Sequence, residues 1–309
     1  MNLIHIDSKF SEEKKREELY RGNLFVTSPN ATTEAFVAFA SNFIERAFGS
    51  ADPETAQHEM QVEEFVEILK LLKPEFIHHQ LSKKFIQAIL QQSGCDMDKT
   101  YFDVPRLRTS TSDNYLTSGI AYAFHPHRDT WYSAPMNQIN WWMPVYDIEI
   151  GNCLALHPAY WDKSIKNSSH QFNYSEWING SRKNSANHIK EDKREQPKPL
   201  EKIDLSSQLR LVVNPGSAIM FSGAHLHSSV PNYSGKTRFS IDFRTIHLDD
   251  LMEGKGAKNI DTACQDLTLA DFLRASDFEH LPEELIDMCK PSRPQELGRY
   301  SPRVMPFLC

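Results

Sequence analysis

The sequence predicts a mixed α+β fold in which a β-rich middle lies between two helical segments. Apolar residues recur at helical spacing through about the first hundred residues, and short β-type segments separated by turn residues follow from about Val104. Helical spacing returns after about Leu248. A chain of 309 residues that is 40% hydrophobic and 11% aromatic can bury a large core. We therefore expect one domain that spans residues 1–309.

The N-terminal region, residues 1–100, contains three candidate amphipathic helices. They are residues 36–48 behind the candidate caps Thr32 and Thr33, residues 62–72 before Pro74, and residues 81–90 before Gly94. Each carries a stripe of aromatic and aliphatic side chains. Such stripes are typical of core packing rather than of cofactor binding.

The middle region, residues 104–246, has the pattern of a β-sandwich or jelly roll. Its candidate strands are Gly119–Phe124, Gln138–Tyr146, Cys153–His157, Leu209–Val213, Ser217–Ser222 and Arg238–Ile246. We expect the helices of both terminal regions to pack outside this core and to buttress it.

A polar insertion of residues 162–207 interrupts the β-rich region. Its many Asn, Ser, Lys and Glu residues favour a solvated loop, and a lid that closes over a substrate is the alternative. The C-terminal region, residues 248–309, is expected to hold helices at Leu267–Ala275 and Leu281–Cys289 before it becomes proline-rich.

Composition excludes several classes of function. The formal net charge of −7 gives no general attraction to nucleic acid or to an anionic membrane. The five cysteines show no CxxC spacing of a zinc ribbon, and no apolar run is long enough to cross a bilayer. We expect a cytoplasmic protein, with peripheral contact at the inner face of the membrane as the alternative. The sequence does not predict an oligomeric state.

The segment from His125 to Tyr132 contains the first candidate metal ligands. His127 and Asp129 are separated by one residue, so on a strand their side chains point to the same face. This pair supplies one imidazole and one carboxylate. A His-x-Asp tripeptide also arises by chance, and a third ligand is therefore needed to make the prediction specific.

A second segment, residues 214–240, offers that third ligand. A Pro-Gly turn opens an apolar strand that ends at His225 and His227, and a further strand begins with Arg238. Two histidines and one carboxylate form the facial triad of non-haem Fe(II) oxygenases, which leaves other coordination positions open. The same ligands also suit a zinc-dependent hydrolase, or a β-sandwich binding module with a structural metal.

These motifs resemble the Fe(II)/2-oxoglutarate-dependent dioxygenase superfamily, and within it the phytanoyl-CoA dioxygenase-like branch. In that branch the third ligand is followed after five residues by Asn and after eleven by the arginine that binds 2-oxoglutarate. Counting from His227 gives Asn232 and Arg238, whereas counting from His225 gives no match. His227 is therefore the predicted ligand. The resemblance covers about residues 104–246.

The resemblance implies a double-stranded β-helix, a jelly-roll or cupin-like core, with the metal site at its open end. It implies Fe(II) as the metal, with 2-oxoglutarate and dioxygen as co-substrates. Arg238, Asn140 and Ser240 are the positions where it implies contacts with 2-oxoglutarate. Related halogenases carry a small residue at the position of Asp129, so the resemblance implies hydroxylation, with desaturation and ring chemistry as the alternatives that use the same triad.

The substrate is predicted less directly. Candidate substrate-binding residues are Arg106, Arg108, His125, Trp131, Tyr132 and Arg244. Several arginines in an acidic chain favour a small anionic substrate. The longer strings around Asp129 and Asn140 resemble a subgroup that includes the lipopolysaccharide Kdo 3-hydroxylases, which implies an acidic sugar, either small or carried on a lipid A precursor. An amino acid or a peptide-like natural product is the alternative.

Overall fold

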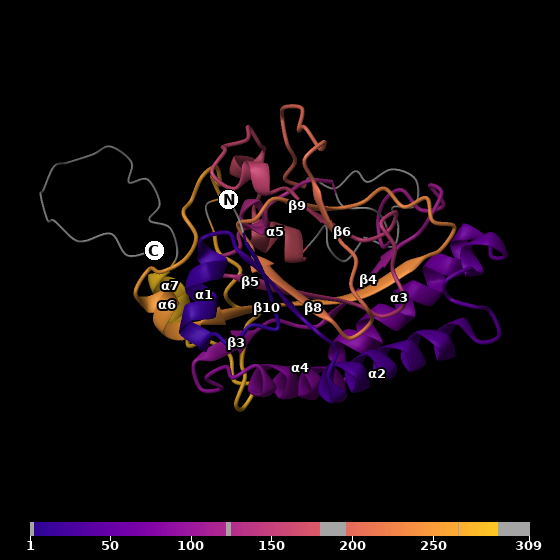
Figure 1. The fold of residues 1–309 in the computed structure, drawn as a ribbon, viewed down its shortest axis with the longest axis horizontal. Helices are drawn as coiled ribbons and strands as arrows, with labels where there is room; N and C mark the ends of the chain where they lie inside the picture. Colours follow the sequence, from indigo (N-terminus) through magenta and orange to yellow (C-terminus); the bar gives the residue numbers. More distant parts are fainter. Residues whose placement is uncertain (1–2, 122–124, 180–195, 265, 290–309) are drawn as a thin grey trace, which may run out of the picture.

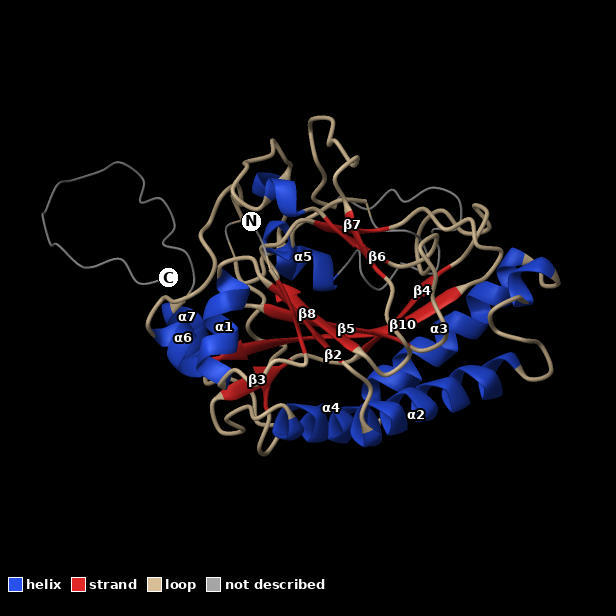
Figure 2. Cartoon of the chain, in the orientation of Figure 1, coloured by secondary structure: helices blue, strands red, loops and turns tan. Residues whose placement is uncertain are grey.

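The computed structural model describes residues 3–121, 125–179, 196–264 and 266–289. An eight-stranded sheet and a three-stranded sheet form the β-rich part, and helices cover the outer face of the larger sheet (Figures 1 and 2). The predicted mixture of helices and a large sheet core is confirmed. Among the described residues, no helix is both long and apolar enough to span a bilayer.

The larger sheet runs in the order β1-β2-β8-β5-β10-β3-β11, with β4 also paired to β10. Its strands are β1 (Ile4–Ile6), β2 (Leu24–Thr27), β3 (Thr100–Phe102), β4 (Arg106–Ser110), β5 (Ile139–Pro144), β8 (Ala218–Ser222), β10 (Arg238–His247) and β11 (Leu273–Arg274). β1 and β2 are parallel, and the other pairs are antiparallel. The smaller sheet contains β7 (Leu209–Leu211), β6 (Leu154–Leu156) and β9 (His227–Ser229).

The strand predictions hold for five of the six segments, because β5, β6, β7, β8 and β10 all lie where alternation placed a strand. The prediction for Gly119–Phe124 was wrong over residues 119–121, which form a turn and a bend, and residues 122–124 lie outside the described residues. The strands that were not predicted have two to five residues each. Such short segments become strands only when a distant partner supplies their hydrogen bonds.

Seven α-helices complete the described part of the chain. They are α1 (Glu12–Tyr20), α2 (Ala31–Phe48), α3 (Val62–His78), α4 (Gln80–Gln92), α5 (Tyr174–Asn179), α6 (Leu248–Met252) and α7 (Glu283–Met288). In Figure 2, α2, α3 and α4 lie on one side of the larger sheet, while β6 and β7 lie on the other. α1, α6 and α7 gather at one edge of the sheet (Figure 1).

The N-terminal helices begin and end slightly differently from the prediction. α2 begins one turn earlier, because the Asn30 side chain accepts hydrogen bonds from the amides of Thr32 and Thr33 at 3.0 and 3.1 Å. The Thr33 hydroxyl in turn accepts one from the Asn30 amide. α3 continues through Pro74 to His78. Pro74 removes one helical hydrogen bond, and beyond it Phe76 is fully buried against Phe36 and Phe43 of α2.

The helix predicted at Leu267–Ala275 was wrong. These residues form turns and the short strand β11, which pairs with β3. Leu269 and Phe272 are fully buried, so the apolar spacing is used for packing in irregular structure rather than for a helix. The second prediction in this region is confirmed, since α7 lies within Leu281–Cys289.

Alternation along β10 gives the larger sheet two different faces. Phe239, Ile241 and Phe243 are fully buried in the cluster that the N-terminal helices cover. Arg238 and Asp242 alternate with them and line a cavity on the opposite face. One strand therefore supplies both the apolar core and a polar cavity wall.

Candidate metal centre

His127, Asp129 and His227 form the candidate metal site. Each offers one ligand atom, these atoms lie within 4.8 Å of one another, and all three residues are buried. His227 begins β9, His127 lies opposite it, and Asp129 is the first residue of a 3-10 helix, Asp129–Tyr132. The structure thus brings together the three residues that the sequence predicted as ligands.

The local geometry differs from the predicted strand. Only His127 makes a β-bridge, in which its amide and that of His227 each donate to the other's carbonyl at 3.0 Å. Asp129 has already left the extended conformation, and its amide donates to the carbonyl of Gly223 at 2.9 Å. The two ligands of the motif therefore converge because separate backbone bonds hold each of them, not because they share a regular strand.

Backbone carbonyls orient both histidine rings in the same way. Nδ1 of His127 lies 2.8 Å from the carbonyl oxygen of His125, and Nδ1 of His227 lies 2.9 Å from that of His225. A carbonyl only accepts, so each Nδ1 must carry the proton, and each Nε2 keeps its lone pair. This is the tautomer that metal-binding histidines need.

Asp129 uses its two oxygens differently. Oδ1 lies 3.5 Å from Nε2 of His127 and 3.7 Å from Nε2 of His227. Oδ2 accepts hydrogen bonds from the amides of Gln138 and Asn140, both at 2.8 Å. The second oxygen is therefore fixed by the protein while the first points at the histidines, as a monodentate metal ligand requires.

The charges at the site favour a carboxylate at Asp129 beside a neutral imidazole at His227. Burial raises the pKa of Asp129, but the nearby charge of Arg244 and the two histidines outweigh it, so the pKa lies well below its usual value. Burial, and then the neighbouring His127, lower the pKa of His227 to about 3. Both groups are thus in the protonation state that binds a divalent cation.

A cavity of about 340 Å³ opens onto the three ligands. Its floor is the polar face of β4, β5 and β10, and β6 and β9 of the smaller sheet contribute Leu154 and Ser229. Aromatic side chains of the insertion, Phe172, Tyr174 and Trp177, form another wall. A site of this kind has room for a small ligand next to the metal.

Arg238 lies in this cavity where the resemblance predicted the 2-oxoglutarate anchor. Its side chain donates to the carbonyls of Asn152 and Cys153 at 3.0 and 3.3 Å, and it lies over the ring of Trp142. Nε of Arg238 is buried and has no hydrogen-bond partner among the described residues. Burial lowers the pKa of Arg238 to about 10, which is the response expected of a cation held without a counter-ion.

Ser240 and Asn140 lie on the same face of the sheet as Arg238, but Asn140 pairs with Arg244, six residues further along β10. Ser240 follows Arg238 by two residues on β10, and its buried hydroxyl makes no hydrogen bond within the described part of the chain. Asn140 lines the cavity, but its amide is used to hold Asp129. Their predicted contact with 2-oxoglutarate remains a prediction, and the structure adds a positioning role for Asn140.

The three candidate arginines of the substrate pocket line the cavity, but carboxylates already neutralise them. Arg108 makes a forked ion pair with Asp242 at 2.6 and 3.3 Å. Arg106 and Arg244 both bind Asp103, Arg244 at 3.0 Å, and Arg244 also lies 3.5 Å from Asp129. The carboxylates were not predicted, since nothing in the sequence pairs residue 103 or 242 with these arginines.

The other candidate substrate residues have different positions. Tyr132 lines the cavity, as predicted. His125 lies beside His127, and its Nε2 contacts the carbonyl of Pro197 at 2.9 Å. Trp131 is fully buried in a separate cluster, where its indole donates to Asp261 at 2.7 Å, so its prediction as a substrate-binding residue was wrong.

His225, the alternative third ligand, is fully buried away from the three ligand atoms and lies against the ring of Trp161.

Gln138 was not predicted. It precedes Asn140 by two residues and therefore shares its face, which is the signal that could have identified it. Gly223 makes room for it, because a β-carbon there would lie 3.0 Å from the Gln138 amide nitrogen.

The polar insertion is more than a solvated loop. Its described parts contain α5, and Phe172, Tyr174, Trp177 and Gln196 line the cavity. Residues 180–195 lie outside the described residues. The insertion thus occupies the position that a lid would need, and closure over a substrate remains a prediction.

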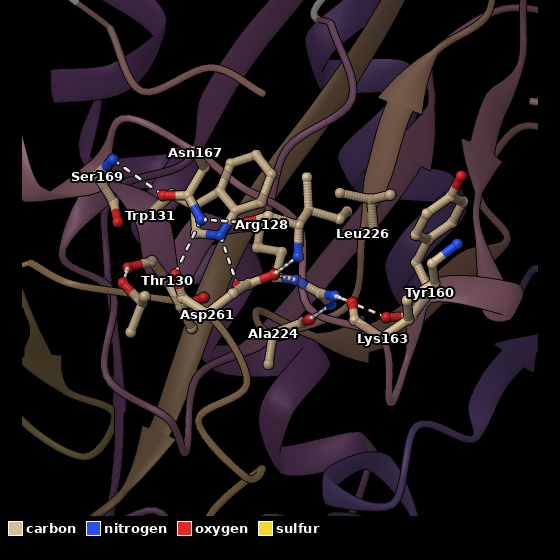
Figure 3. Close-up of polar contacts among 12 residues, drawn as sticks. Arg128, Thr130, Trp131, Tyr160, Lys163, Asn167, Ser169, Ala224, Leu226 and Asp261 are labelled. Carbon is tan, nitrogen blue, oxygen red and sulfur yellow. Dashed lines mark hydrogen bonds and ion pairs between the residues drawn. The ribbon is translucent and has the colours of Figure 1, made fainter. Parts of the chain in front are cut away.

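Arg128, between the two ligands of the motif, points away from the cavity into a buried polar cluster (Figure 3). Its guanidinium donates to Asp261 at 3.1 Å and to the carbonyls of Ala224 and Tyr160, both at 2.6 Å. Asp261 also accepts from the Trp131 indole. One buried ion pair therefore ties together four segments that surround the metal ligands.

No family model matches the sequence, and no curated protein matches it. Solved structures give low similarity. EvdO2 from Micromonospora carbonacea var. aurantiaca shares 15% identity over 79% of this chain and 94% of its own, with a TM-score of 0.44. The same protein has been solved with 2-oxoglutarate.

Two further structures come from other proteins. SnoK, a non-heme alpha ketoglutarate dependent carbocyclase from nogalamycin biosynthesis, shares 12% identity over 77% of this chain and 85% of its own, with a TM-score of 0.37. A nickel complex of the non-heme monooxygenase ThoJ shares 12% identity over 78% and 82%, with a TM-score of 0.32. At these values, the chemistry must be inferred from the residues of the cavity itself.

The buried Arg128–Asp261 pair gives a test of stability. Arg128→Met leaves Asp261 as a buried, partly uncompensated charge, so we expect a loss of about 3–5 kcal/mol in the free energy of unfolding, measured with urea. Asp249→Asn, which breaks the exposed pair with Lys99, is the control and should cost less than about 1 kcal/mol. Equal effects of the two substitutions would contradict this account.

Proposed function

We propose that this chain is a non-haem Fe(II)/2-oxoglutarate-dependent dioxygenase that hydroxylates a small, anionic, sugar-like substrate. One observation carries the proposal: a buried arginine without a carboxylate partner in the described residues lies in the same cavity as a His-Asp-His ligand set. We further propose that residues 1–309 form one catalytic domain around a double-stranded β-helix.

The residues fit both the metal and its co-substrate. Two neutral imidazoles and one carboxylate suit Fe(II), and they leave positions for other ligands. The unpartnered Nε of Arg238 and the unpartnered hydroxyl of Ser240 are buried donors, so a carboxylate of 2-oxoglutarate would satisfy both. Bound Fe(II) would supply the activation of dioxygen that lets 2-oxoglutarate be oxidised together with the substrate.

The chain's own residues prepare this chemistry in three ways. Gln138 and Asn140 hold Asp129 so that only Oδ1 faces the metal. The carbonyls of His125 and His225 fix the tautomer of the two histidines. The aromatic wall of Phe172, Tyr174 and Trp177 limits the access of water to the cavity.

A zinc-dependent hydrolase and a metal-binding module are the alternative functions. Both would use the same three ligands, but neither needs a buried cation with unsatisfied donors near the metal. The cost of burying Arg238 without a counter-ion has a simple explanation only if an anion binds there. This favours the oxygenase.

The metal ligands are tested by anaerobic titration of the protein with Fe(II) and 2-oxoglutarate. The wild-type protein should develop the visible metal-to-oxoglutarate charge-transfer band, and with air it should form succinate. Asp129→Ala and His227→Gln should lose both signals, because each removes one of three ligands.

His225→Gln separates ligand loss from general damage, because His225 is buried but lies outside the ligand set. This variant should be less stable and should still give the charge-transfer band. Absence of the band in the wild-type protein would contradict the oxygenase proposal. Loss of the band in His225→Gln together with its retention in His227→Gln would identify His225 as the third ligand instead.

Arg238 gives a separate prediction about the co-substrate. Arg238→Gln removes the charge from a charge-assisted pair, so we expect the Kd for 2-oxoglutarate to rise by about 10–100-fold. Arg238→Lys keeps the charge without the forked geometry, so its Kd for 2-oxoglutarate should lie between those of the wild-type protein and Arg238→Gln. Binding of Mn(II) by calorimetry is the control, because Arg238 is not a ligand, and an unchanged 2-oxoglutarate Kd in Arg238→Gln would exclude the assignment.

The substrate is tested by mass spectrometry for the gain of one oxygen. We expect product from an acidic sugar, with Kdo-lipid A precursors and free Kdo as the first compounds, because the cavity carries more cations than carboxylates. Amino acids and peptide-like natural products form the comparison panel. Turnover of a neutral compound alone, or a product formed by desaturation or epimerisation, would contradict this part of the proposal.

A further inference from the structure

Five cations among the described residues line the cavity, and they differ in which carboxylate, if any, balances their charge. They are Lys73, Arg106, Arg108, Arg238 and Arg244. Arg106, Arg108 and Arg244 pair with Asp103 or Asp242. Arg238 has no carboxylate partner in the described part of the chain, and the proposed function gives it 2-oxoglutarate. Lys73 is the remaining cation, and the proposed function leaves it unused.

Lys73 reaches the cavity from the helix side of the sheet. It belongs to α3, which packs against β4, the strand that carries Arg106 and Arg108 (Figure 1). Its ammonium donates to the backbone carbonyl of Ile120, which also lines the cavity. Lys73 makes no ion pair within the described residues. Both oxygens of the nearby Asp242 carboxylate already accept hydrogen bonds from Arg108.

The electrostatic environment of Lys73 is unfavourable in the absence of an anion. The pKa of Lys73 falls to about 7, because burial and then the nearby charge of Arg108 lower it and Asp242 opposes them only in part. A lysine held against a neighbouring arginine becomes stable as a cation when an anion binds between them. Burial likewise lowers the pKa of Arg238, and 2-oxoglutarate is the anion proposed to bind there.

We propose that Lys73, together with Arg108, forms a second anion subsite in this cavity, which binds the negatively charged group of the substrate. The subsite differs from that of Arg238 in the cation that defines it, because Lys73 approaches from α3, whereas Arg238 lies on β10 and donates to the carbonyls of Asn152 and Cys153. In this subsite the negatively charged group of the substrate is recognised by Lys73, a residue outside the β-rich region. The arginines paired with Asp103 contribute hydrogen bonds rather than net charge.

The balance of charge selects a monoanion. Four carboxylates, Asp103, Asp129, Asp242 and Asp271, line the same cavity as the five cations. This inference rests on the proposed function, in which Fe(II) and the dianion 2-oxoglutarate cancel one another. Among the cavity residues that the structure describes, one positive charge then remains, which fits a carboxylate better than a phosphate dianion. The substrate class is therefore a small carboxylic acid with polar groups for the paired arginines and aspartates.

The test measures how fast Lys73 is methylated by formaldehyde and borane, followed by peptide mass spectrometry. The full chain is loaded with Mn(II) and saturating 2-oxoglutarate, so that Arg238 is occupied, and the ionic strength is held constant with NaCl. Acetate is the probe, and acetamide is its neutral match. We expect saturable protection of Lys73 that is about tenfold stronger with acetate than with acetamide, because only acetate accepts a charge-assisted hydrogen bond.

Lys99 is the internal control, because it is exposed and paired with Asp249, and its methylation should be the same with either probe. Arg108→Gln should weaken the protection by acetate, whereas Arg238→Gln should keep it. Equal methylation of Lys73 in acetate and acetamide would overturn the proposal.

The two proposals fail separately. If the charge-transfer band is absent but acetate still protects Lys73, the proposed anion subsite is supported and the proposed oxygenase function is contradicted. If the band is present and acetate gives no protection, the oxygenase stands and this subsite falls.

Discussion

The pair of backbone hydrogen bonds between His127 and His227 is the constraint on which the site depends. These residues are a hundred positions apart, and the reciprocal bonds at 3.0 Å place their rings 4.3 Å apart between centroids. The carbonyls two residues before each of them then turn the rings the same way. Because the backbone sets both position and tautomer, the ligand atoms are arranged before any metal binds, which lowers the cost of binding.

The buried charges around this bridge follow one rule, which is that each has a defined partner or a defined task. On one side Arg128 and Asp261 neutralise each other and hold the loops behind the ligands (Figure 3). On the other side Asp103 and Asp242 neutralise Arg106, Arg108 and Arg244. Against this background, the two cations without a carboxylate among the described residues, Arg238 and Lys73, are the positions where a ligand anion explains an otherwise unfavourable burial.

Much of the fold could be predicted because it depends on local periodicity. The three N-terminal helices and the longer strands repeat their apolar residues every 3.6 or every 2 positions, and burial of one face follows directly. The segment 267–275 shows the limit of this reasoning, since Leu269 and Phe272 have helical spacing but pack in an irregular segment next to β11. Strands as short as β9 and β11 have too few residues for a periodic signal and form only against a partner.

The sequence by itself determined which residue types could bind a metal, and the spacing to Arg238 that the family resemblance implies made His227 the predicted ligand. It did not determine what surrounds them. The pairing of Arg106 and Arg244 with Asp103, the burial of Trp131 and Arg128, and the entry of Lys73 from α3 were decided only by the tertiary structure. The physical reason is that a ligand motif is encoded by neighbours in the chain, whereas the charge balance of a cavity depends on side chains that long-range packing brings together.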